Sequence, residues 1–410
     1  MRELPPTDGL PLRAGDFFRK PPKPLDAGLA EMFGLPEVTL TCSGTAALVV
    51  ILHTLRALRP QRDEVVVPAY TCPLVPLAVA LIPGLRPVAC DTAPLSFDFD
   101  SEMLPRLCSD RTLAVIPAHL GGQVADTAPA SAAARRCGAA LVEDAAQAVG
   151  ARVAGQSVGS AADAAFFSLA AGKGLTTYEG GGLFSADPKL AVLLRQTARR
   201  LLRPHALWTV RRNIELAAYT FFYRPDRLRF VYGIPLRRAL AQGREDKAAG
   251  DCFTRDDIPL HSLDALRARA AANALPRLPA HLEAGRRRAA ARLDALLSLP
   301  GVFVFQDRPG TEGTRPFFML LMPSAKRRAA ALKRLWGAGL GVSRLFVRAL
   351  PDYASTGPLF TDSPPCPNAR DLAERMLTVS NSAALDEESF RHITEILRAC
   401  LEAAPVTAGL

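Results

Sequence analysis

ALVEDAAQ at residues 140–147 and AAFFSLAAGKGLTTYEGGG at residues 164–182 are the stretches that decide the fold. Each opens with a short apolar run typical of a buried strand, and polar or glycine-rich residues follow directly. A third run, GGLFSA at 181–186, closes the second loop. The pattern predicts buried strands whose end loops carry two carboxylates and a lone lysine, Lys173.

The chain around these stretches alternates strand-like and helix-like segments. Residues 46–58 and 129–137 have helix-like composition. Further strand-like runs are VTLTC (38–42), EVVVPA (64–69), RPVACD (86–91) and TLAVIPA (112–118). This alternation is the signature of βαβ units, so we expect an α/β fold with a mainly parallel sheet covered by helices. In such sheets, ligands bind beyond the carboxyl ends of the strands.

The second half of the chain has a different pattern. Residues 263–297 predict helices, which Pro276 and Pro279 divide in two. Strands at FVFQ (303–306) and RPFFMLLMP (315–323) and helices at 325–338 and 387–402 are expected to follow. Because 410 residues exceed what one core usually organises, we expect a large domain over residues 1–250 and a smaller C-terminal α+β domain over residues 251–410.

Composition indicates a folded, soluble protein. Hydrophobic residues make up 49% of the chain and charged residues 22%, near the averages for globular domains. The opening residues do not resemble a secretory signal, and no apolar run approaches about 18 residues, so we expect a cytoplasmic protein. Eight cysteines without a CxxC pair disfavour a disulfide framework and a zinc site. We expect reduced, mostly buried thiols and no metal.

The net charge of +10 is concentrated in one segment. Between Arg195 and Arg238 there are eleven arginines and two acids, interleaved with apolar and aromatic residues. One explanation is a helical insertion that packs on its own dimer and exposes its arginines. The other is a peripheral contact with an anionic membrane or a lipid diphosphate. No recognised motif favours nucleic acid, so none is expected as a partner.

Three groups of residues could carry chemistry, and each has a structural alternative. Ser43, Gly44 and Thr45 could cap a helix or cradle a phosphate. Asp144, at a strand end, could cap a helix or bind a ligand. Lys173 could be an exposed lysine at a loop tip, or a desolvated amine with a lowered pKa that acts as a nucleophile. The residues alone leave these alternatives open.

Taken together, the segments resemble the DegT/DnrJ/EryC1/StrS aminotransferases, enzymes that use pyridoxal 5'-phosphate (PLP) to aminate keto-sugar nucleotides. The matching stretches are SGTAAL (43–48), DEVVVP (63–68), HLGGQVAD (119–126), EDAAQ (143–147), FS (167–168) with Lys173 five residues past the serine, and EGG (179–181). The resemblance is strong over residues 38–190 and weaker over 315–400. It implies fold type I of the PLP-dependent transferases, with residues 1–250 as the PLP-binding domain.

The resemblance also implies residue roles. Lys173 would carry PLP as a Schiff base, and Asp144 would keep the pyridine nitrogen of the cofactor protonated. Gln147 would bond near the ring hydroxyl. The phosphate would be held by Gly44, Thr45 and Ser168. Relatives that remove a sugar hydroxyl have histidine where this chain has Lys173, so the lysine favours amino transfer.

The chain departs from the family pattern in several places. Relatives stack an aromatic ring on the cofactor where this chain has Cys72. Nearby Tyr70 could replace that ring or point into the core. Tyr178 stands where many relatives have a small residue, so it could narrow the substrate pocket or only pack. The short Asn- and Arg-containing motif that reaches the neighbouring subunit in relatives has no counterpart here.

Three further residues have two interpretations each. His119 falls in a family motif, but a histidine that ends a buried strand is more often a hydrogen-bonded structural residue. Arg344 and Arg348 could bind a substrate phosphate or carboxylate, or form surface salt bridges.

The sequence therefore predicts a homodimeric PLP-dependent transaminase. The enzyme would move an amino group, from glutamate by resemblance, to a keto-sugar nucleotide in polysaccharide, glycolipid or secondary-metabolite biosynthesis. One alternative is an aminotransferase that acts on a non-nucleotide, cyclitol-like ketone. Another is a non-catalytic PLP-binding protein with a regulatory or membrane-associated role.

Overall fold

A seven-stranded sheet forms the centre of the first half of the chain in this computed structural model, which describes residues 2–402. Its strand order is β1-β9-β8-β5-β4-β2-β3. The strands are β1 (Thr39–Thr41), β2 (Glu64–Pro68), β3 (Arg86–Cys90), β4 (Thr112–Val115), β5 (Ala140–Asp144), β8 (Ala164–Ser168) and β9 (Gly181–Phe184). Strands β3, β2, β4, β5 and β8 run parallel, whereas β9 is antiparallel to both β8 and β1. The expected mainly parallel sheet is confirmed.

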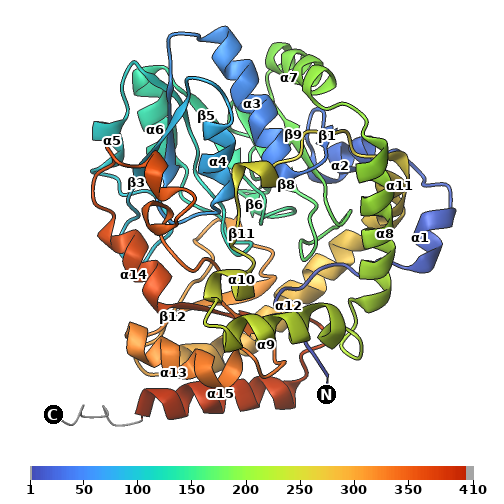
Figure 1. Cartoon of the computed structure of the whole chain (residues 1–410), viewed down its shortest axis with the longest axis vertical. Coiled ribbons are helices and arrows are strands. Elements are labelled where there is room, and N and C mark those ends of the chain that lie inside the picture. Colours follow the sequence, from blue (N-terminus) through green and yellow to red (C-terminus); the bar gives the residue numbers. More distant parts are fainter. Residues whose placement is uncertain (1, 403–410) are drawn as a thin grey trace.

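Helices cover this sheet because its strands are apolar on both faces. Every residue of β2, β4, β5, β8 and β9 is buried, as in sheets that lie between two helical layers. Figure 1 shows α3 and α7 on one side of the strands and α5 and α6 towards the other edge. The helices of this half include α3 (Gly44–Leu58), α4 (Leu74–Ala80), α5 (Leu104–Leu107), α6 (Ala128–Cys137) and α7 (Pro188–Leu201).

The basic segment is helical. It comprises α8 (Ala206–Phe222), a π-helical turn (Arg229–Gly233), α9 (Ile234–Ala241) and α10 (Glu245–Ala249). Figure 1 shows α8 as a long helix at the outer edge of the molecule, next to α11. No helix among residues 2–402 combines the length and the apolar composition needed to cross a bilayer.

The second half begins with the two helices that the prolines were expected to separate. Helix α11 (Ala265–Ala274) ends in a 3₁₀ turn (Leu275–Arg277) that contains Pro276, and α12 (Leu278–Leu297) follows with Pro279 in its first turn. The break arises because proline lacks an N–H and fits only the first turn of a helix.

A four-stranded antiparallel sheet completes this half, in the order β10-β12-β14-β13. Its strands are β10 (Phe303–Val304), β12 (Phe317–Leu321), β13 (Val342–Ser343) and β14 (Met376–Ser380), and its helices are α13 (Ala325–Leu335), α14 (Pro367–Arg375) and α15 (Glu387–Glu402). The expected strands and helices are present; α15 has the expected bounds, and the other three elements are slightly shorter than expected. A domain boundary at residue 250 stays a prediction.

Two segments tie the halves together. The N-terminal residues contact the second half, since the backbone N–H of Leu4 donates to Gly339 O and that of Asp8 donates to Pro316 O. A small sheet pairs β6 (Arg152–Val153) with β7 (Gln156–Ser157) and with β11 (Thr311–Glu312). Residues of the second half therefore contact both the start of the chain and the segment that follows β5.

All eight cysteines are free thiols. Four are buried and three are partly buried, whereas Cys252 is exposed. The structure therefore contains no disulfide among these eight residues.

Candidate active site

Two cavities meet at Lys173. The sheet-edge cavity, about 320 Å³, lies at the carboxyl ends of β5 and β8 and at the start of α3. The N-terminal cavity, about 240 Å³, lies between residues 6–8, α12 and the antiparallel sheet. Ala146, Gln147 and Lys173 line both. A group bonded to Lys173 in the first cavity could therefore meet a second molecule in the other.

The sheet-edge cavity brings together every residue proposed to hold the cofactor. Its lining includes Gly44, Thr45, Cys72, Asp144, Gln147, Ser168 and Lys173. These residues come from segments separated by more than a hundred positions in the sequence, and the parallel strands bring them together because their carboxyl ends lie at one edge of the sheet.

Asp144 and Lys173 have perturbed titration behaviour. Burial raises the pKa of Asp144 to about 6, although the Ala146 N–H, His119 and Lys173 act to lower it. Burial lowers the pKa of Lys173, and the nearby Cys72 and Asp144 offset only part of this effect. A buried carboxylate is stabilised by a cation placed against it, and a desolvated amine is available as a nucleophile at neutral pH. The loop-tip interpretation of Lys173 does not fit its position between two cavities.

The start of α3 forms one end of the sheet-edge cavity. Ser43 is the N-cap, and its Oγ accepts the N–H of Ala46 at 3.0 Å, so this hydroxyl has the structural role. Gly44 lies so close to β8 that a Cβ atom there would be 3.2 Å from both Phe167 O and Ser168 Cβ. Glycine permits this close approach without displacing β8, and the helix N-terminus lies beside the cavity.

Thr71 is a polar residue of this cavity to which the sequence interpretation gave no role. Its Oγ1 is buried and has no hydrogen-bond partner among the described residues, although the residue lines the cavity. A buried hydroxyl without a partner costs free energy. Its neighbour Cys72 also lines the cavity, so residues 71–72 present two small side chains to a ligand.

The structure decides between Tyr70 and Cys72. The ring of Tyr70 is fully buried, packs edge-on against Phe346 at a centroid distance of 5.5 Å, and does not line the cavity. Tyr70 is therefore a core residue and does not replace the missing stacking ring. Phe253 lines the cavity instead, from the segment after α10. No motif marks this position, so the sequence interpretation missed it.

Gln147 and His119 are oriented by hydrogen bonds. The Oε1 atom of Gln147 accepts the N–H of Gly121 at 2.9 Å, so its amide nitrogen is the end left to donate to a ligand. His119 is buried between Glu143 Oε2, 3.0 Å from Nε2, and the N–H of Ala125, 3.0 Å from Nδ1. Because Nδ1 accepts, Nε2 carries the proton and donates to Glu143. This bonding matches the structural interpretation of His119.

The two arginines of the second half differ. Arg344 is buried, lines the N-terminal cavity and forms an ion pair with Glu245. Its Nη2 donates to the carbonyls of Val347 and Ala373 at 2.9 and 2.6 Å, so most of its donors serve the fold. Arg348 is exposed and lines neither cavity.

The N-terminal segment is a further feature that the sequence interpretation missed. Thr7 Oγ1 donates to Gly172 O at 2.8 Å, and the N–H of Leu10 donates to Gly174 O at 2.9 Å. These bonds hold the loop on both sides of Lys173. Asp8, buried in the same cavity, pairs with Arg288 at 2.5 Å and with His281 at 3.4 Å. No local signal links these residues to Lys173, because 165 positions separate Thr7 from Gly172.

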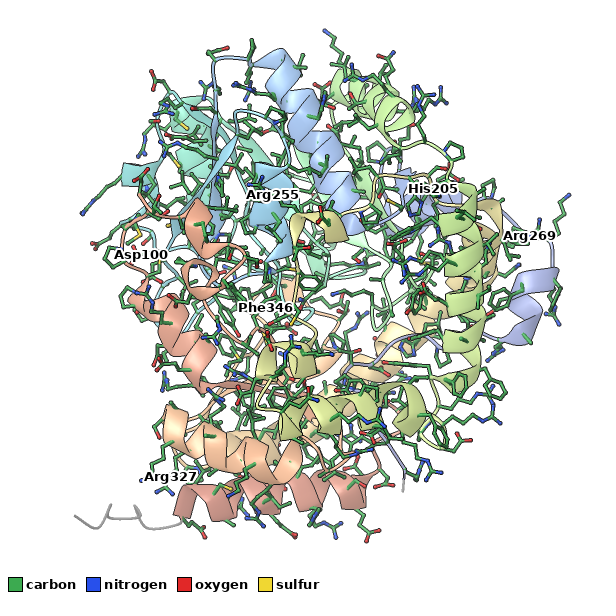
Figure 2. The ribbon with its side chains drawn as sticks, in the orientation of Figure 1. Asp100, His205, Arg255, Arg269, Arg327 and Phe346 are labelled. Carbon is green, nitrogen blue, oxygen red and sulfur yellow. The ribbon has the colours of Figure 1, made fainter. Side chains whose placement is uncertain are left out.

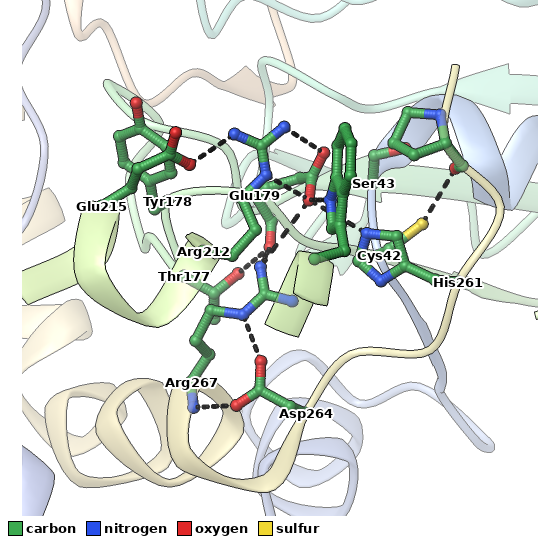
Figure 3. A network of polar contacts seen from close by, with 12 residues as sticks. Cys42, Ser43, Thr177, Tyr178, Glu179, Arg212, Glu215, His261, Asp264 and Arg267 are labelled. Carbon is green, nitrogen blue, oxygen red and sulfur yellow. Dashed lines mark hydrogen bonds and ion pairs between the residues drawn. The ribbon is translucent and has the colours of Figure 1, made fainter. Parts of the chain in front are cut away.

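A polar network after the lysine loop joins this site to α8 and α11 (Figure 3). Glu179 accepts hydrogen bonds from Trp208 Nε1 at 2.9 Å and from Arg212 Nε and Nη2 at 2.8 and 3.0 Å. The fully buried Arg267 donates to the Glu179 backbone oxygen at 2.6 Å. His261 Nε2 lies 3.3 Å from the carboxylate. The loop that carries Lys173 is thus fixed to two helices.

Tyr178 takes part in this packing and not in the pockets. It has a left-handed backbone conformation, with φ of 65°. Its ring lies 6.1 Å from that of Tyr219 on α8, and it lines neither of the two cavities. The packing interpretation of Tyr178 therefore holds.

The architecture is that of fold type I of the PLP-dependent transferases. A solved structure of the PLP form of Spr1654 from Streptococcus pneumoniae superimposes with a TM-score of 0.73, covering 97% of this chain and 98% of that one at 18% identity. The expected fold class is confirmed.

Within this fold, residues 20–212 match the DegT/DnrJ/EryC1/StrS aminotransferase family model. GDP-perosamine synthase of Caulobacter vibrioides is 36% identical over 170 residues, which are 42% of this chain and 45% of that protein. L-glutamine:2-deoxy-scyllo-inosose aminotransferase of Streptomyces fradiae is 36% identical over 162 residues, or 40% and 38% of the two chains. The chain thus spans less than half the length of these curated relatives.

Proposed function

We propose that this protein is a PLP-dependent aminotransferase that transfers an amino group to a keto-sugar nucleotide. The observation that carries the proposal is the position of Lys173 between two cavities. Asp144 and the N-terminus of α3 line the first cavity, and the second can admit another molecule. The match of residues 20–212 to an aminotransferase family model supports the reaction class. The name of the Caulobacter relative, a GDP-perosamine synthase, supports a sugar nucleotide as the acceptor.

The residues of the sheet-edge cavity fit PLP in their chemistry. Asp144 is a buried carboxylate with a raised pKa. A protonated pyridine nitrogen placed against it would stabilise its charged form. The start of α3 suits the phosphate, with Gly44, Thr45 and Ser168 around it. The unpartnered Thr71 hydroxyl provides one more donor. When bound, PLP would supply an electron sink for the carbanion formed at the substrate Cα.

Lys173 and Asp144 would perform the chemistry of this chain. The Nζ atom of Lys173 would hold the cofactor covalently and, once released by the amino donor, would move a proton to and from the substrate Cα. A lowered pKa helps both tasks because it increases the share of neutral amine. The charge of Asp144 would keep the ring nitrogen protonated. Gln147 would orient the ring, and Cys72 and Phe253 would border it.

The absorbance spectrum of the purified protein tests the proposal. We expect a visible band that depends on PLP, and borohydride should remove it and label a single peptide that contains Lys173. Addition of glutamate, the proposed amino donor, should then shift the band of untreated protein. A colourless protein that binds no added PLP would contradict the proposal, and so would a label on another lysine.

A cyclitol-like ketone is the second candidate acceptor. The Streptomyces relative is named for a 2-deoxy-scyllo-inosose substrate, and its identity to this chain equals that of the sugar-nucleotide relative. Single-turnover spectroscopy with both ketone classes separates the candidates. Reaction with the cyclitol alone would exclude the first acceptor. A spectrum that no donor changes would instead favour a non-catalytic PLP-binding protein with a regulatory role.

The assembly and location are also proposals. We propose a cytoplasmic homodimer, by analogy with the family, with a peripheral contact to the membrane through the segment Arg195–Arg238. We propose a large PLP-binding domain over residues 1–250 and a smaller domain over residues 251–410. Equilibrium sedimentation of the purified chain tests the dimer directly, and a mass equal to one chain would exclude it.

A further inference from the structure

Helix α8 has two unlike faces, and its inner face is fully engaged. Trp208 and Arg212 bind the Glu179 carboxylate, and Tyr219 packs against Tyr178 and stacks on Tyr223 at a centroid distance of 4.4 Å. These contacts fix the helix against the loop that carries Lys173. The orientation of the opposite face is therefore set by the fold.

The outer face of α8 is apolar and exposed. Leu207, Val210, Ile214 and Phe221 are spaced by three, four and seven residues, which places them on one side of a helix. Their exposed fractions range from 54% for Phe221 to 80% for Leu207. In Figure 2, His205 marks the start of this helix at the outer edge of the molecule.

The apolar surface continues beyond α8. Phe230 and Val231, in the π-helical turn, and Ile234, at the start of α9, are also exposed. Fifteen large apolar side chains are exposed among residues 2–402, and seven of them lie between residues 207 and 234. Such a concentration in water is unfavourable unless something covers it. We call these seven residues the α8 surface.

Basic residues are interleaved with the α8 surface along the chain, and Arg227 and Arg229 lie over the rings of Phe221 and Phe230. Of the two acids between Arg195 and Arg238, Glu215 is paired with Arg211 and Arg212, and Asp226 lies 3.3 Å from Arg227. Several exposed arginines have no carboxylate partner within the described part of the chain: Arg199, Arg203, Arg224 and Arg238. A partner that covers the α8 surface must therefore provide both apolar groups and negative charge.

A second copy of the chain meets only the first requirement. In a two-fold contact the same surface faces itself, so the net positive patch of one copy would lie against the same patch of the other. Like charges placed face to face oppose association. A bilayer with anionic lipids provides both an apolar interior and negative headgroups, and helices with a basic border and an apolar face bind there.

We propose that the α8 surface docks the protein on a bilayer that contains anionic lipids. Leu207, Val210, Ile214 and Phe221 enter the headgroup region, and the unpaired arginines contact lipid phosphates. This inference specifies which residues make the proposed peripheral contact and which lipid charge they require. It does not depend on catalytic activity. A protein that binds vesicles and lacks turnover would satisfy it.

A third cavity lies beside the docked face. It measures about 430 Å³ and is lined by Thr220, Tyr223 and Arg224 of the α8 segment. It shares Thr7, Asp8 and His281 with the N-terminal cavity that contains Lys173. Docking through α8 therefore places this third cavity near the lipid headgroups, and the third cavity adjoins the candidate active site.

Vesicle flotation of the full chain tests the inference. We expect the purified protein to float with vesicles of phosphatidylcholine and phosphatidylglycerol, to stay in solution with phosphatidylcholine alone, and to be released by salt. The combined variant Leu207→Ser, Val210→Ser and Ile214→Ser should bind at least about tenfold more weakly. The matched control Phe18→Ser, which removes an exposed ring on another helix, should float like the wild type.

Charge reversal provides an independent variant. Arg224→Glu with Arg238→Glu leaves the apolar stripe intact and should weaken binding to anionic vesicles at least about fivefold. The inference is overturned if the wild type does not float with anionic vesicles, or if both variants float as it does. It is also overturned if the serine variant converts a dimer to a monomer while the wild type ignores vesicles, because a second copy would then cover the surface.

Discussion

Replacement of Glu179 by glutamine should destabilise the protein strongly, because its carboxylate holds the lysine loop and α8 together. Three N–H groups, from Trp208 and Arg212, lie within 3.0 Å of its oxygens. Glutamine keeps the shape of the side chain but turns one acceptor into a donor that faces donors. Arg212 then loses one of its two carboxylate partners.

The magnitude follows from burial. Removing one partner of a buried ion pair costs about 3–5 kcal/mol. The side chains of Glu179 and Arg212 are 13% and 16% exposed, and Glu215 still pairs with Arg212 in the variant. We therefore expect a loss at the lower end of this range, about 3 kcal/mol. Glu283 is a matched control: it pairs with Arg286 and Arg287 on one helix but is half exposed, so glutamine there should cost about 0.5 kcal/mol or less.

Urea unfolding of both variants and of the wild type at pH 7 measures these losses. The pH dependence gives a second test. Burial alone would raise the pKa of Glu179, but His261, Trp208 and Arg212 outweigh it and hold the pKa below the ordinary value of 4.5. Its stabilisation is therefore complete above pH 4.5 and is lost as the pH falls through the lower folded value. A loss at pH 7 no larger than that of the Glu283 variant would refute this reasoning.

Three further substitutions test the candidate active site. Lys173→Ala should abolish covalent labelling by borohydride and lower turnover at least about 100-fold, measured with a coupled glutamate assay. Asp144→Asn should weaken PLP binding, yet raise the stability of the cofactor-free protein at neutral pH by about 1–3 kcal/mol. The sign follows because the Asp144 pKa is raised from 3.8 to about 6, so the folded wild type loses stability as the pH rises through this range. The free energy of unfolding of both proteins at pH 4 and pH 7 tests this. A variant that is no more stable than the wild type at pH 7 would contradict it. Phe253→Ala should weaken PLP binding by up to about tenfold in an absorbance titration, whereas Phe18→Ala should not change it.

Much of the fold was predictable from local sequence patterns. The run ALVED forms β5 with every residue buried, and the glycine-rich loop after AAFFS carries Lys173, as expected. The helix expected over residues 387–402 has these bounds in the structure. These predictions succeed because hydrophobic periodicity, proline and glycine act within a few residues of their position.

The choice between neighbouring residues was not predictable. Tyr70 and Cys72 stand two positions apart at the end of one strand, and either could face the cofactor. Phe346, nearly three hundred positions later, packs against Tyr70 and draws it into the core. Phe253 then borders the cavity from a segment without a motif. A side chain's direction at a strand end depends on partners that the local sequence does not contain.

By itself the sequence determined the main strands of the first sheet, its mainly parallel character and the placement of Asp144 at a strand end and of Lys173 in the loop after one, because these depend on local periodicity and chain order; β13, α14 and β14 were not among its predictions. Only the tertiary structure decided that residues 6–8 line the cavity at Lys173, that Glu179 joins the lysine loop to α8 and α11, and that α8 turns an apolar face outward. Those features depend on contacts between distant segments, and their free energy appears only when the whole chain has folded.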